Sequence, residues 1–452
     1  MSEARIDPAA VPAAVHTLAT RLRAVGGRAW LVGGPVRDLL LGLPVRDHDL
    51  ATDLVPERVA AVFPEGEARD RRFGVVHVPS EVGDVTITTL RRDLGASDHR
   101  RPDAVAFVDR LEVDACRRDF TVNALYADLQ SGQVEDPAHG LADLQARCLR
   151  TVGEPGRRFA EDALRLLRAI RFAARCELAI EPATFAALQA AASGVATVSA
   201  ERQFDELTRA FTGPGRGRAL ALLVSSGLAA VLLPEVAAMD GVTQPPEYHP
   251  EGCVLTHTGL VLEQVPDADP VLAWAAVLHD VGKPPTWRQA EDRIRFDGHD
   301  VLGASMADAI LRRLRAANAL REAVVDVCRH HIRFATLPQM RPVRAERWMR
   351  SPEFPAHLAF HRADCLGSHG DLRLFHEAKR RFAELPPERP PLLQGADVLA
   401  LGVLPGPEVG RLLRAVETAA EEAPTAWGRA EAMALLRDLV AQSRQEPDGS
   451  TR

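Results

Sequence analysis

The sequence predicts an α+β protein, in which a small α/β head precedes an elongated, all-helical remainder. Short runs of apolar and β-branched residues, bounded by glycine and charged residues, occur within about the first 145 residues. After Thr151 glycine becomes rarer, and apolar residues recur at the three- and four-residue spacing of helices. The length of 452 residues exceeds what one hydrophobic core usually serves, so we expect several domains.

The head is predicted to begin with a helix over residues 11–25, because its apolar residues fall on one stripe. A short apolar strand over 29–32 then enters a glycine turn, and a helix follows over 36–41. Alternating or β-branched residues predict the remaining strands, which cover 47–52, 74–79, 84–90 and 133–135.

Changes in composition divide the rest of the chain. Helical periodicity dominates to about residue 240, and a group of prolines at 245, 246 and 250 then interrupts it. A second proline-rich run covers 386–391 and is typical of a linker. We therefore predict a head over 1–145, a helical neck over 146–243, a histidine-bearing helical domain over 244–380 and a helical tail over 381–452.

The composition is that of a soluble globular protein, with 46% hydrophobic and 26% charged residues and a net charge of −7. The acidic balance does not by itself indicate nucleic acid, although arginine clusters could still line a basic cleft. The six cysteines form no C-x-x-C pair, so we expect reduced thiols. The N-terminus lacks a signal-peptide layout, and the longest uncharged stretch, 219–234, is too short to cross a bilayer. These features predict a cytoplasmic protein without membrane contact.

A glycine turn and a pair of carboxylates carry the first chemical prediction. Gly33 and Gly34 end an apolar run, and adjacent glycines let backbone N–H groups approach a bulky anion such as phosphate. Asp47 and Asp49, at i and i+2 of a strand, point to one face and can hold Mg²⁺. Either half alone would be read as a surface turn or as solvated aspartates. Their combination, with Arg37 between them, predicts a nucleotidyl-transfer site.

Three motifs resemble those of one family. Residues 31–38 with Asp47 and Asp49, residues 117–125 and residues 161–171 contain LVGGPVRD with D-H-D, RRDFTVNAL and EDALRLLRAIR. They are similar to the GG-x-VRD turn with its D-x-D pair, the RRDFTxNA motif and the ED-x-x-R-x-x-R motif of the class II tRNA nucleotidyltransferase and bacterial poly(A) polymerase family.

The resemblance implies a role for each of these residues. Asp47 and Asp49 would be the catalytic carboxylates and would hold Mg²⁺. The residues implied to bind the nucleotide are Gly33, Gly34, Arg37, Arg118, Asp162, Arg165, Arg168 and Arg171. Asp119 and Asn123 would shape the junction between head and neck.

Asp162 and Arg165 are three apart on a predicted helix, and so are expected to be neighbours on its surface. The pair has a chemical rationale as a base-reading template. Cytosine and adenine each present an amino donor beside a ring-nitrogen acceptor, whereas uracil and guanine present a carbonyl beside an N–H. A carboxylate beside a guanidinium complements the first arrangement and opposes the second. Leaving such groups unpaired costs about 1–3 kcal/mol each, which is enough for useful discrimination. An ordinary ion pair on an exposed helix is the alternative.

The chain departs from the family pattern at two positions. Thr86 stands where a glutamate is usual, and Asp84, two residues earlier on the same strand face, could take its place in part. Cys253 stands where an acidic residue is common. The segment 92–101 resembles the loop that is linked to switching from C to A addition, and its completeness favours the full CCA activity.

The histidines of the third predicted domain follow the order H…HD…H…H…D, which resembles an HD phosphohydrolase domain. Histidine with carboxylate is a good ligand set for a divalent transition metal. The resemblance implies one ion held by His257, His279, Asp280 and Asp364, with His299 and His330 available for a second. Such domains hydrolyse phosphomonoesters or phosphodiesters through metal-activated water. Lys283 fits the same pattern and could meet a phosphate.

Together these features predict an enzyme that adds CCA to tRNA 3′ ends from CTP and ATP with release of pyrophosphate, and that has an additional HD-domain phosphohydrolase activity. A specialist that adds only CC or only A would keep every motif. A poly(A) polymerase is a close alternative, although the glycines at 74 and 153 resemble the tRNA enzymes more. An alternative of another class is a metal-dependent HD phosphohydrolase with a non-catalytic nucleotide- or RNA-binding head.

Overall fold

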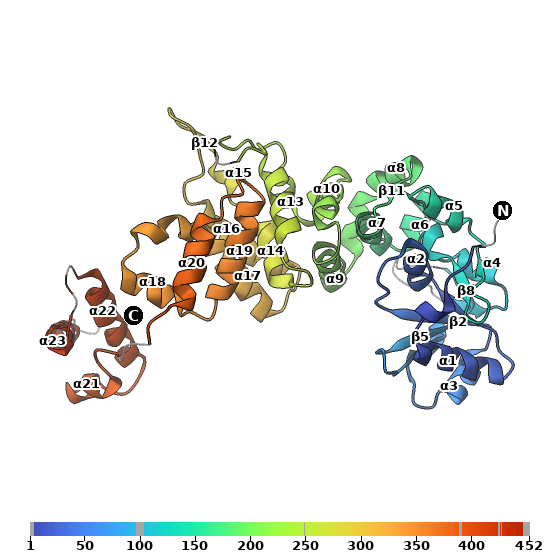
Figure 1. Cartoon of the computed structure of the whole chain (residues 1–452), viewed down its shortest axis with the longest axis horizontal. Helices are drawn as coiled ribbons and strands as arrows, with labels where there is room; N and C mark the ends of the chain where they lie inside the picture. Colours follow the sequence, from blue (N-terminus) through green and yellow to red (C-terminus); the bar gives the residue numbers. More distant parts are fainter. Residues whose placement is uncertain are drawn as a thin grey trace, which may run out of the picture. The chain divides into compact units, whose positions relative to one another are not determined.

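The computed structural model of the chain describes residues 4–95, 104–247, 249–387, 391–423, 425 and 427–445. It divides into two compact units, Met1–His331 with Arg362–Gly370, and Ile332–His361 with Asp371–Arg452. Figure 1 shows the main sheet in the blue N-terminal part, whereas the green to red remainder is almost entirely helical. This arrangement confirms the predicted α+β class. No described helix has both the length and the apolar content that crossing a bilayer requires.

The head is built on a seven-stranded sheet in the order β3-β4-β5-β2-β1-β8-β9. Its neighbouring strands are antiparallel except β2 and β5, which run parallel and place Asp49 beside Thr86. The strands are β1 (Ala29–Val32), β2 (His48–Thr52), β3 (Glu67–Asp70), β4 (Val75–Val78), β5 (Val85–Thr89), β8 (Tyr126–Asp128) and β9 (Val134–Glu135). All the predicted strands are present, whereas the sequence did not reveal β3 and β8, because β3 lacks apolar alternation and β8 is three residues long.

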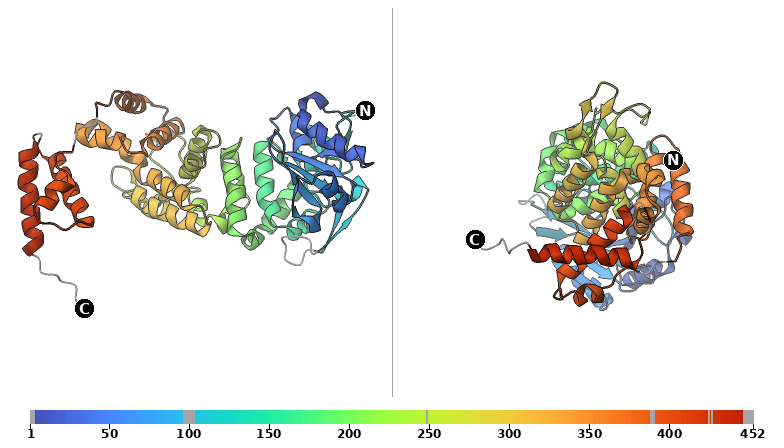
Figure 2. Two further views of the ribbon diagram at one scale, coloured as in Figure 1. Left: turned by 90° about the horizontal axis from the view of Figure 1, so that it is seen from below. Right: turned by 90° about the vertical axis from the view of Figure 1, so that its left-hand side faces the viewer.

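Helices cover the head sheet, and a separate hairpin leaves it. Helix α1 packs on β1 and β2, and Figure 2 shows it against the sheet. The head helices are α1 (Ala13–Ala24), α2 (Gly34–Leu41), α3 (Pro56–Val62), α4 (Leu111–Ala115) and α5 (Gly140–Gln145). The hairpin consists of β6 (Arg91–Leu94) and β7 (Ala104–Phe107). Most of the predicted switching loop, residues 96–101, lies outside the described residues.

The neck contains short helices with one interruption that the sequence did not predict. The helices are α6 (Pro155–Glu161), α7 (Leu164–Arg175), α8 (Pro182–Ala190), α9 (Ala200–Phe211), α10 (Arg216–Ser225), α11 (Leu228–Leu232) and α12 (Pro234–Ala237). Asp162 has φ −151° and ψ 105°, so the motif over 161–171 is not one continuous helix. The Asp162 carboxylate instead accepts the Leu164 N–H at 3.0 Å, at the start of α7. Asp162 and Arg165 are therefore not neighbours on a helix surface.

The histidine-bearing part of the first unit is a helical cluster around α14, whose seven residues from Leu272 to Leu278 are all buried. It comprises α13 (Val254–Gln264), α14 (Pro270–Leu278), α15 (Lys283–Thr286), α16 (His299–Arg313) and α17 (Asn318–His330). Helix α19 (Phe354–Leu366) contributes its last residues to this unit. The boundaries between the four predicted domains remain predictions.

The second unit is helical, as predicted for the tail. It contains α18 (Pro342–Met349), α20 (Arg373–Ala383), α21 (Gly395–Ala400), α22 (Pro407–Glu422) and α23 (Arg429–Gln445). One apolar core forms around Trp348 and Phe354, and another around Leu412 and Leu436. Residues 388–390 of the predicted linker lie outside the described residues.

Candidate active site and candidate metal centre

A pocket of about 590 Å³ opens where the glycine turn, the start of β2, residues 117–119 (the RRD segment) and α7 meet. Every residue that the motifs predicted for the head and neck lines this pocket: Gly33, Gly34, Arg37, Asp47, Asp49, Arg118, Asp162, Arg165, Arg168 and Arg171. The pocket thus brings together residues more than 100 positions apart. Arg46, Arg117, Phe172 and Arg209 also line it, and the sequence assigned no role to any of them.

The glycine turn joins β1 to α2 at the floor of the pocket. Gly33 has φ 77°, a conformation that side chains rarely tolerate. A Cβ there would also lie 3.3 Å from Arg118 Nη1 and 3.4 Å from the Asn123 carbonyl oxygen. Both constraints explain a glycine at this position, and they bring the turn next to the Arg118 guanidinium.

Asp47 and Asp49 both face the pocket, Asp49 from β2 and Asp47 from the residues just before it. Burial raises the pKa of Asp49, and the neighbouring Asp47 raises it further, while Arg118 and Thr86 oppose this shift. The burial of Asp49 and its repulsion by Asp47 make the charged pair unfavourable. A divalent cation would offset both effects, so the pair fits such an ion. Thr86 contributes a neutral hydroxyl beside Asp49. The oxygen of this hydroxyl lies 3.4 Å from His77 Nδ1. Asp84 is exposed and does not line the pocket.

A fully buried carboxylate, Asp114, positions the arginines of the RRD segment. Asp114 Oδ2 accepts hydrogen bonds from Arg118 Nη2 at 3.0 Å and from the Tyr126 hydroxyl at 2.7 Å. Its other oxygen accepts from Arg117 Nε at 2.8 Å. Burial alone would raise the pKa of Asp114, but the guanidinium groups of Arg118 and Arg117 hold it well below the usual range. Sequence reasoning missed this residue, since a single aspartate on a five-residue helix carries no motif.

The two residues proposed to read the base have separate partners. Arg165 donates to the main-chain oxygens of Arg158 and Arg117, each at 3.0 Å, and so joins α7 to the RRD segment. Asp162 Oδ2 lies 3.7 Å from Arg202 on α9. Burial raises the pKa of Asp162, while the Leu164 N–H and Arg202 lower it. Both side chains line the same pocket as the carboxylate pair.

Two further arginines of α7 are held by carboxylates. Arg168 pairs with Asp119 at 2.7 Å, and Arg171 pairs with Glu206 of α9 at 2.6 Å. Both guanidinium groups also lie over the Phe172 ring, at 5.0 and 4.3 Å from its centroid. Sequence reasoning missed Glu206, because it lies on another helix and belongs to no motif.

Arg37 is engaged inside the protein. Its side chain is 1% exposed and pairs with Asp38 at 2.6 Å, and it also donates to Asn123. Arg175 of α7 binds the same aspartate at 2.7 Å. Asp38 therefore joins α2 to the neck through Arg175, while Arg37 is held within the head, and its predicted contact with a triphosphate remains a prediction.

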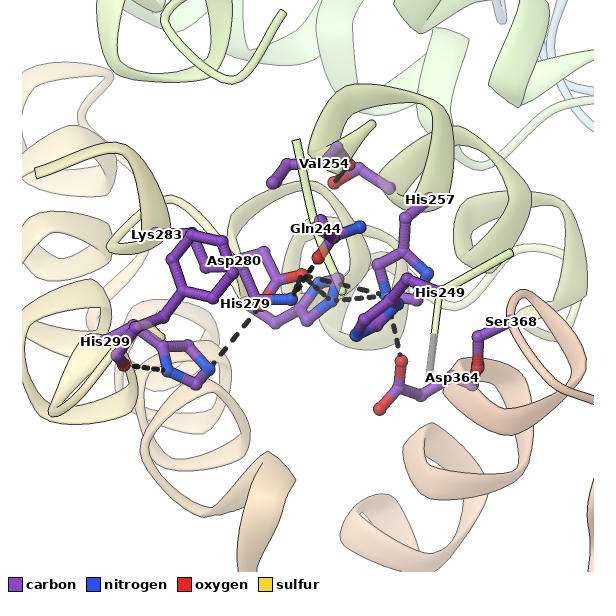
Figure 3. Close-up of polar contacts among 12 residues, drawn as sticks. Gln244, His249, Val254, His257, His279, Asp280, Lys283, His299, Asp364 and Ser368 are labelled. Carbon is purple, nitrogen blue, oxygen red and sulfur yellow. Dashed lines mark hydrogen bonds and ion pairs between the residues drawn. The ribbon is translucent and has the colours of Figure 1, made fainter. Parts of the chain in front are cut away.

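The second candidate site is a cluster of imidazoles and carboxylates in the histidine-bearing part. Figure 3 shows His257, His279, Asp280, His299 and Asp364 converging from α13, the end of α14, α16 and α19. His257 Nε2 lies 3.3 Å from His279 Nε2 and 3.1 Å from Asp364 Oδ1. His299 Nε2 lies 3.2 Å from His331 Nε2, on the other side of Asp280.

The opposite ring nitrogens fix how these imidazoles are protonated. The Nδ1 atoms of His279, His299 and His331 lie 2.9, 2.8 and 2.6 Å from main-chain carbonyl oxygens, which can only accept. Each of these Nδ1 atoms therefore donates its hydrogen, and Nε2 of the neutral ring carries a lone pair. Lone pairs that converge beside carboxylates are the arrangement of metal ligands. The residues fit a divalent transition metal.

One predicted ligand has to be corrected. The structure places His331, not His330, beside Asp280 and His299. His330 instead lies with Nδ1 3.1 Å from Asp326 Oδ1, one helical turn earlier on α17. Adjacent residues point about 100° apart around a helix, so only one of the pair can face the cluster. The sequence could not choose between them without the position of α17.

A segment before α13 adds polar groups to this cluster. Glu251 Oε1 lies 2.8 Å from His257 Nδ1 and 3.0 Å from His249 Nδ1.

Lys283, the first residue of α15, adds a positive charge to the cluster. Its Nζ lies 2.7 Å from Asp280 Oδ2 and donates to Gln244 Oε1 at 2.5 Å. Cys253, the other departure from the family pattern, directs its sulfur towards the Met239 carbonyl oxygen at 3.7 Å.

Three family models match the chain. Residues 29–150 match the poly A polymerase head domain, and residues 177–239 match a probable RNA- and SrmB-binding site of polymerase A. Residues 252–362 match the HD domain.

Curated relatives match a little under half of the chain. The CCA-adding enzyme of Geobacillus thermodenitrificans is 42% identical over 207 residues, which are 46% of this chain and 51% of the relative. That of Streptococcus pyogenes serotype M2 is 41% identical over 206 residues, again 51% of its length. The chain thus spans about half the length of the curated relatives it matches.

Structural similarity extends further. A crystal structure of the Bacillus stearothermophilus CCA-adding enzyme in complex with CTP has a TM-score of 0.69 and 27% identity, and covers 96% of this chain and 98% of that chain. The Thermotoga maritima CCA-adding enzyme complexed with tRNA has a TM-score of 0.57 at 18% identity, with 97% of each chain covered, which supports the fold alone. The predicted resemblance to the class II family with an HD domain is confirmed.

Proposed function

We propose that this chain, whose domain content and fold are those of class II CCA-adding enzymes with an HD domain, adds C, C and A to tRNA 3′ ends from CTP and ATP. One observation supports this most directly: the carboxylates Asp47 and Asp49 and the pair Asp162 and Arg165 line a single pocket. A site that holds metal-bound phosphates and a site that reads a base are then within reach of one nucleotide. Action on tRNA implies a cytoplasmic location.

In this proposal the head binds the triphosphate and the 3′ hydroxyl. Asp47 and Asp49 would hold Mg²⁺, which supplies charge neutralisation and lowers the pKa of the attacking hydroxyl. The main chain at Gly33 and Gly34 leaves room for a phosphate, and Arg118 offers a guanidinium beside that turn. Asp114 keeps Arg118 in place, so little rearrangement is needed when the nucleotide binds.

The neck selects the base in this proposal. Asp162 would accept from the amino group of cytosine or adenine, and Arg165 would donate to the adjacent ring nitrogen. Arg165 is held by two main-chain oxygens and by the Glu161 carboxylate at 3.1 Å, which together fix its guanidinium plane. Uracil and guanine would place a carbonyl against the carboxylate, so the same pair opposes them.

The test is a nucleotide-by-nucleotide assay. Purified protein is incubated with tRNA ending in the discriminator base, in C or in CC, with each of the four nucleotides supplied separately. We expect C on the first two substrates, A on the third, and no incorporation of U or G. Long A tracts on unrelated RNA would indicate a poly(A) polymerase. Products that stop at CC would indicate a specialist that adds only CC, and addition of A only to tRNA that already ends in CC would indicate a specialist that adds only A. Absence of any product would refute nucleotidyl transfer.

A second activity is supported by the convergence of four imidazoles on Asp280 and Asp364. We propose a metal-dependent phosphohydrolase centre at this cluster, separate from the head pocket. A transition metal would activate water there. Lys283 and Gln244 stand beside Asp280, and the buried Gln244 Nε2 has no hydrogen-bond partner among the described residues, which suits an incoming phosphate oxygen. Release of phosphate from model phosphoesters after Co²⁺, Ni²⁺ or Mn²⁺ addition tests this activity, and Asp47→Asn should leave it intact.

A further inference from the structure

We propose that His77 is a positioning residue of the head, which holds the Thr86 hydroxyl so that Thr86 in turn holds Asp49 in place for the divalent cation. The inference rests on the nucleotidyl transfer proposed above and adds His77, to which the sequence assigned no role. His77 lies on β4 and Thr86 on β5, and neither residue lines the head pocket.

A row of polar residues crosses the head sheet beside the pocket. Asp49 of β2 is in register with Thr86 of β5, and Thr86 is in register with His77 of β4. Glu67 of β3 is in register with His77 and continues the row. Residues directly opposite on neighbouring strands point to the same face of a sheet and lie within contact distance. Only Asp49 among these four lines the pocket, so the row leads from the pocket towards the edge strand of the sheet.

The hydrogen bonds of this row have a defined direction. The Thr86 hydroxyl donates to the ionised Asp49 carboxylate, which can only accept. A hydroxyl has one hydrogen, so the Thr86 oxygen, 3.4 Å from His77 Nδ1, accepts from that ring nitrogen. Nδ1 carries this hydrogen in the neutral ring and in the charged ring alike. Donation therefore runs from His77 to Thr86 and from Thr86 to Asp49.

This direction matters because a hydroxyl can rotate. While the His77 N–H occupies the Thr86 oxygen, the hydroxyl hydrogen is directed at Asp49, and without that donor it can turn to another acceptor. Hydrogen bonds in a chain also strengthen one another. Burial raises the pKa of Asp49, whereas Arg118, Thr86 and His77 each lower it, so His77 also favours the ionised form that binds a cation.

The experiment is a metal titration of the full-length chain without substrate. Protein stripped with a chelator is titrated with Mn²⁺, and electron paramagnetic resonance measures the free ion. Because the histidine cluster can also bind Mn²⁺, the component of binding that Asp47→Asn removes is assigned to the head. We expect His77→Val to weaken this component by about tenfold, as for other outer partners of metal ligands. His77→Asn should retain it, because its amide nitrogen can donate from nearly the position of Nδ1.

A double-mutant cycle tests whether His77 acts through Thr86. Thr86→Val should weaken the head component at least as much as His77→Val does, and adding His77→Val to Thr86→Val should cost nothing further. Independent contributions would add in such a cycle. In nucleotide addition, His77→Val should raise the Mg²⁺ concentration for half-maximal rate by the same factor, while kcat at saturating Mg²⁺ stays close to the wild-type value.

The matched control is Thr88→Val, the same substitution two residues along β5 and on the same face. Thr88 is in register with Ala51 and Val75, which have no polar side-chain atoms. This variant should leave the head component unchanged, and circular dichroism should show every variant folded.

Four results would overturn the proposal: an unchanged affinity in His77→Val, equal losses in His77→Val and His77→Asn, an additive effect with Thr86→Val, or no head component in the wild type. Mn²⁺ binding is measured without substrate, so a wild type that shows the expected binding but adds no nucleotide would refute the proposed function and leave this inference standing.

Discussion

Asp119 Oδ2 lies 2.7 Å from Nη2 and 2.8 Å from Nε of Arg168. Asp119 ends the RRD segment of the head, and Arg168 lies on α7 of the neck. The other oxygen of Asp119 accepts from Asn123 Nδ2 at 3.1 Å. Asp119 and Arg168 are 49 residues apart in the sequence and belong to two different motifs. The Asp119 carboxylate therefore joins these motifs at the edge of the proposed active site.

Replacing this carboxylate should loosen the junction. Asp119→Asn keeps the size of the side chain but loses the charge that pairs with Arg168. We expect the unfolding free energy to fall by about 1.5–3 kcal/mol, the usual worth of a hydrogen bond to a charged group. Urea unfolding followed by circular dichroism measures this change. Arg157→Gln, which alters an exposed i,i+4 pair with Glu161, is the control and should change stability little.

The contribution of Asp119 should also depend on pH. Burial would raise the pKa of Asp119, but Arg168 and Asn123 hold it below its usual range. A depressed pKa stabilises the folded state above the unfolded value of about 3.9, and this contribution is lost as the pH falls through the folded value. The stability difference between the wild type and Asp119→Asn should therefore shrink below about pH 4. A difference that stays constant down to pH 2 would contradict this account.

A third carboxylate should strengthen Mg²⁺ binding in the head. Thr86 lies beside Asp49 across the parallel pair of β2 and β5. Thr86→Glu adds an oxygen ligand and a charge there, so we expect the Mg²⁺ concentration for half-maximal nucleotide addition to fall about tenfold. Thr86→Val is the control, and it should not lower that concentration. An unchanged requirement in Thr86→Glu would show that position 86 does not reach the ions.

The base-reading pair should set nucleotide choice more than overall binding. Asp162→Ala removes the acceptor for the amino group of cytosine and adenine. We expect discrimination against UTP and GTP to fall by about 1–3 kcal/mol, or roughly 5–150-fold in relative kcat/KM. Competition assays with pairs of nucleotides measure this ratio. Arg202→Ala, which removes the neighbour 3.7 Å from Asp162, should change the ratio much less. Equal losses for all four nucleotides in Asp162→Ala would argue against a template.

Metal uptake by the histidine cluster should release protons. Burial would lower the pKa of His257, but the carboxylates of Asp364 and Glu251 raise it to about 9. A metal needs the neutral ring, so its apparent affinity should rise by up to tenfold per pH unit between pH 7 and 9 and then level off. Burial lowers the pKa of His331 to about 4, so this ring contributes no proton at neutral pH. Calorimetry in buffers of different ionisation enthalpy counts the protons, and an affinity independent of pH would contradict the prediction.

The sequence by itself determined the local features of this protein. Glycine placement, β-branched runs and helical periodicity predicted the strands at 29–32 and 84–90 and the helical remainder, because these signals depend on neighbouring residues only. The same locality allowed the motifs to indicate which residues line the head pocket, since each motif is a short contiguous segment.

The tertiary structure decided everything that depends on where distant segments meet. It selected His331 over His330, because the rotation of α17 relative to Asp280 settles which ring faces the cluster. It revealed Glu206 and Glu251, whose partners Arg171 and His257 lie on other elements. A carboxylate acquires its partner, its burial and its pKa only when the chain folds around it, and no local pattern encodes those distances.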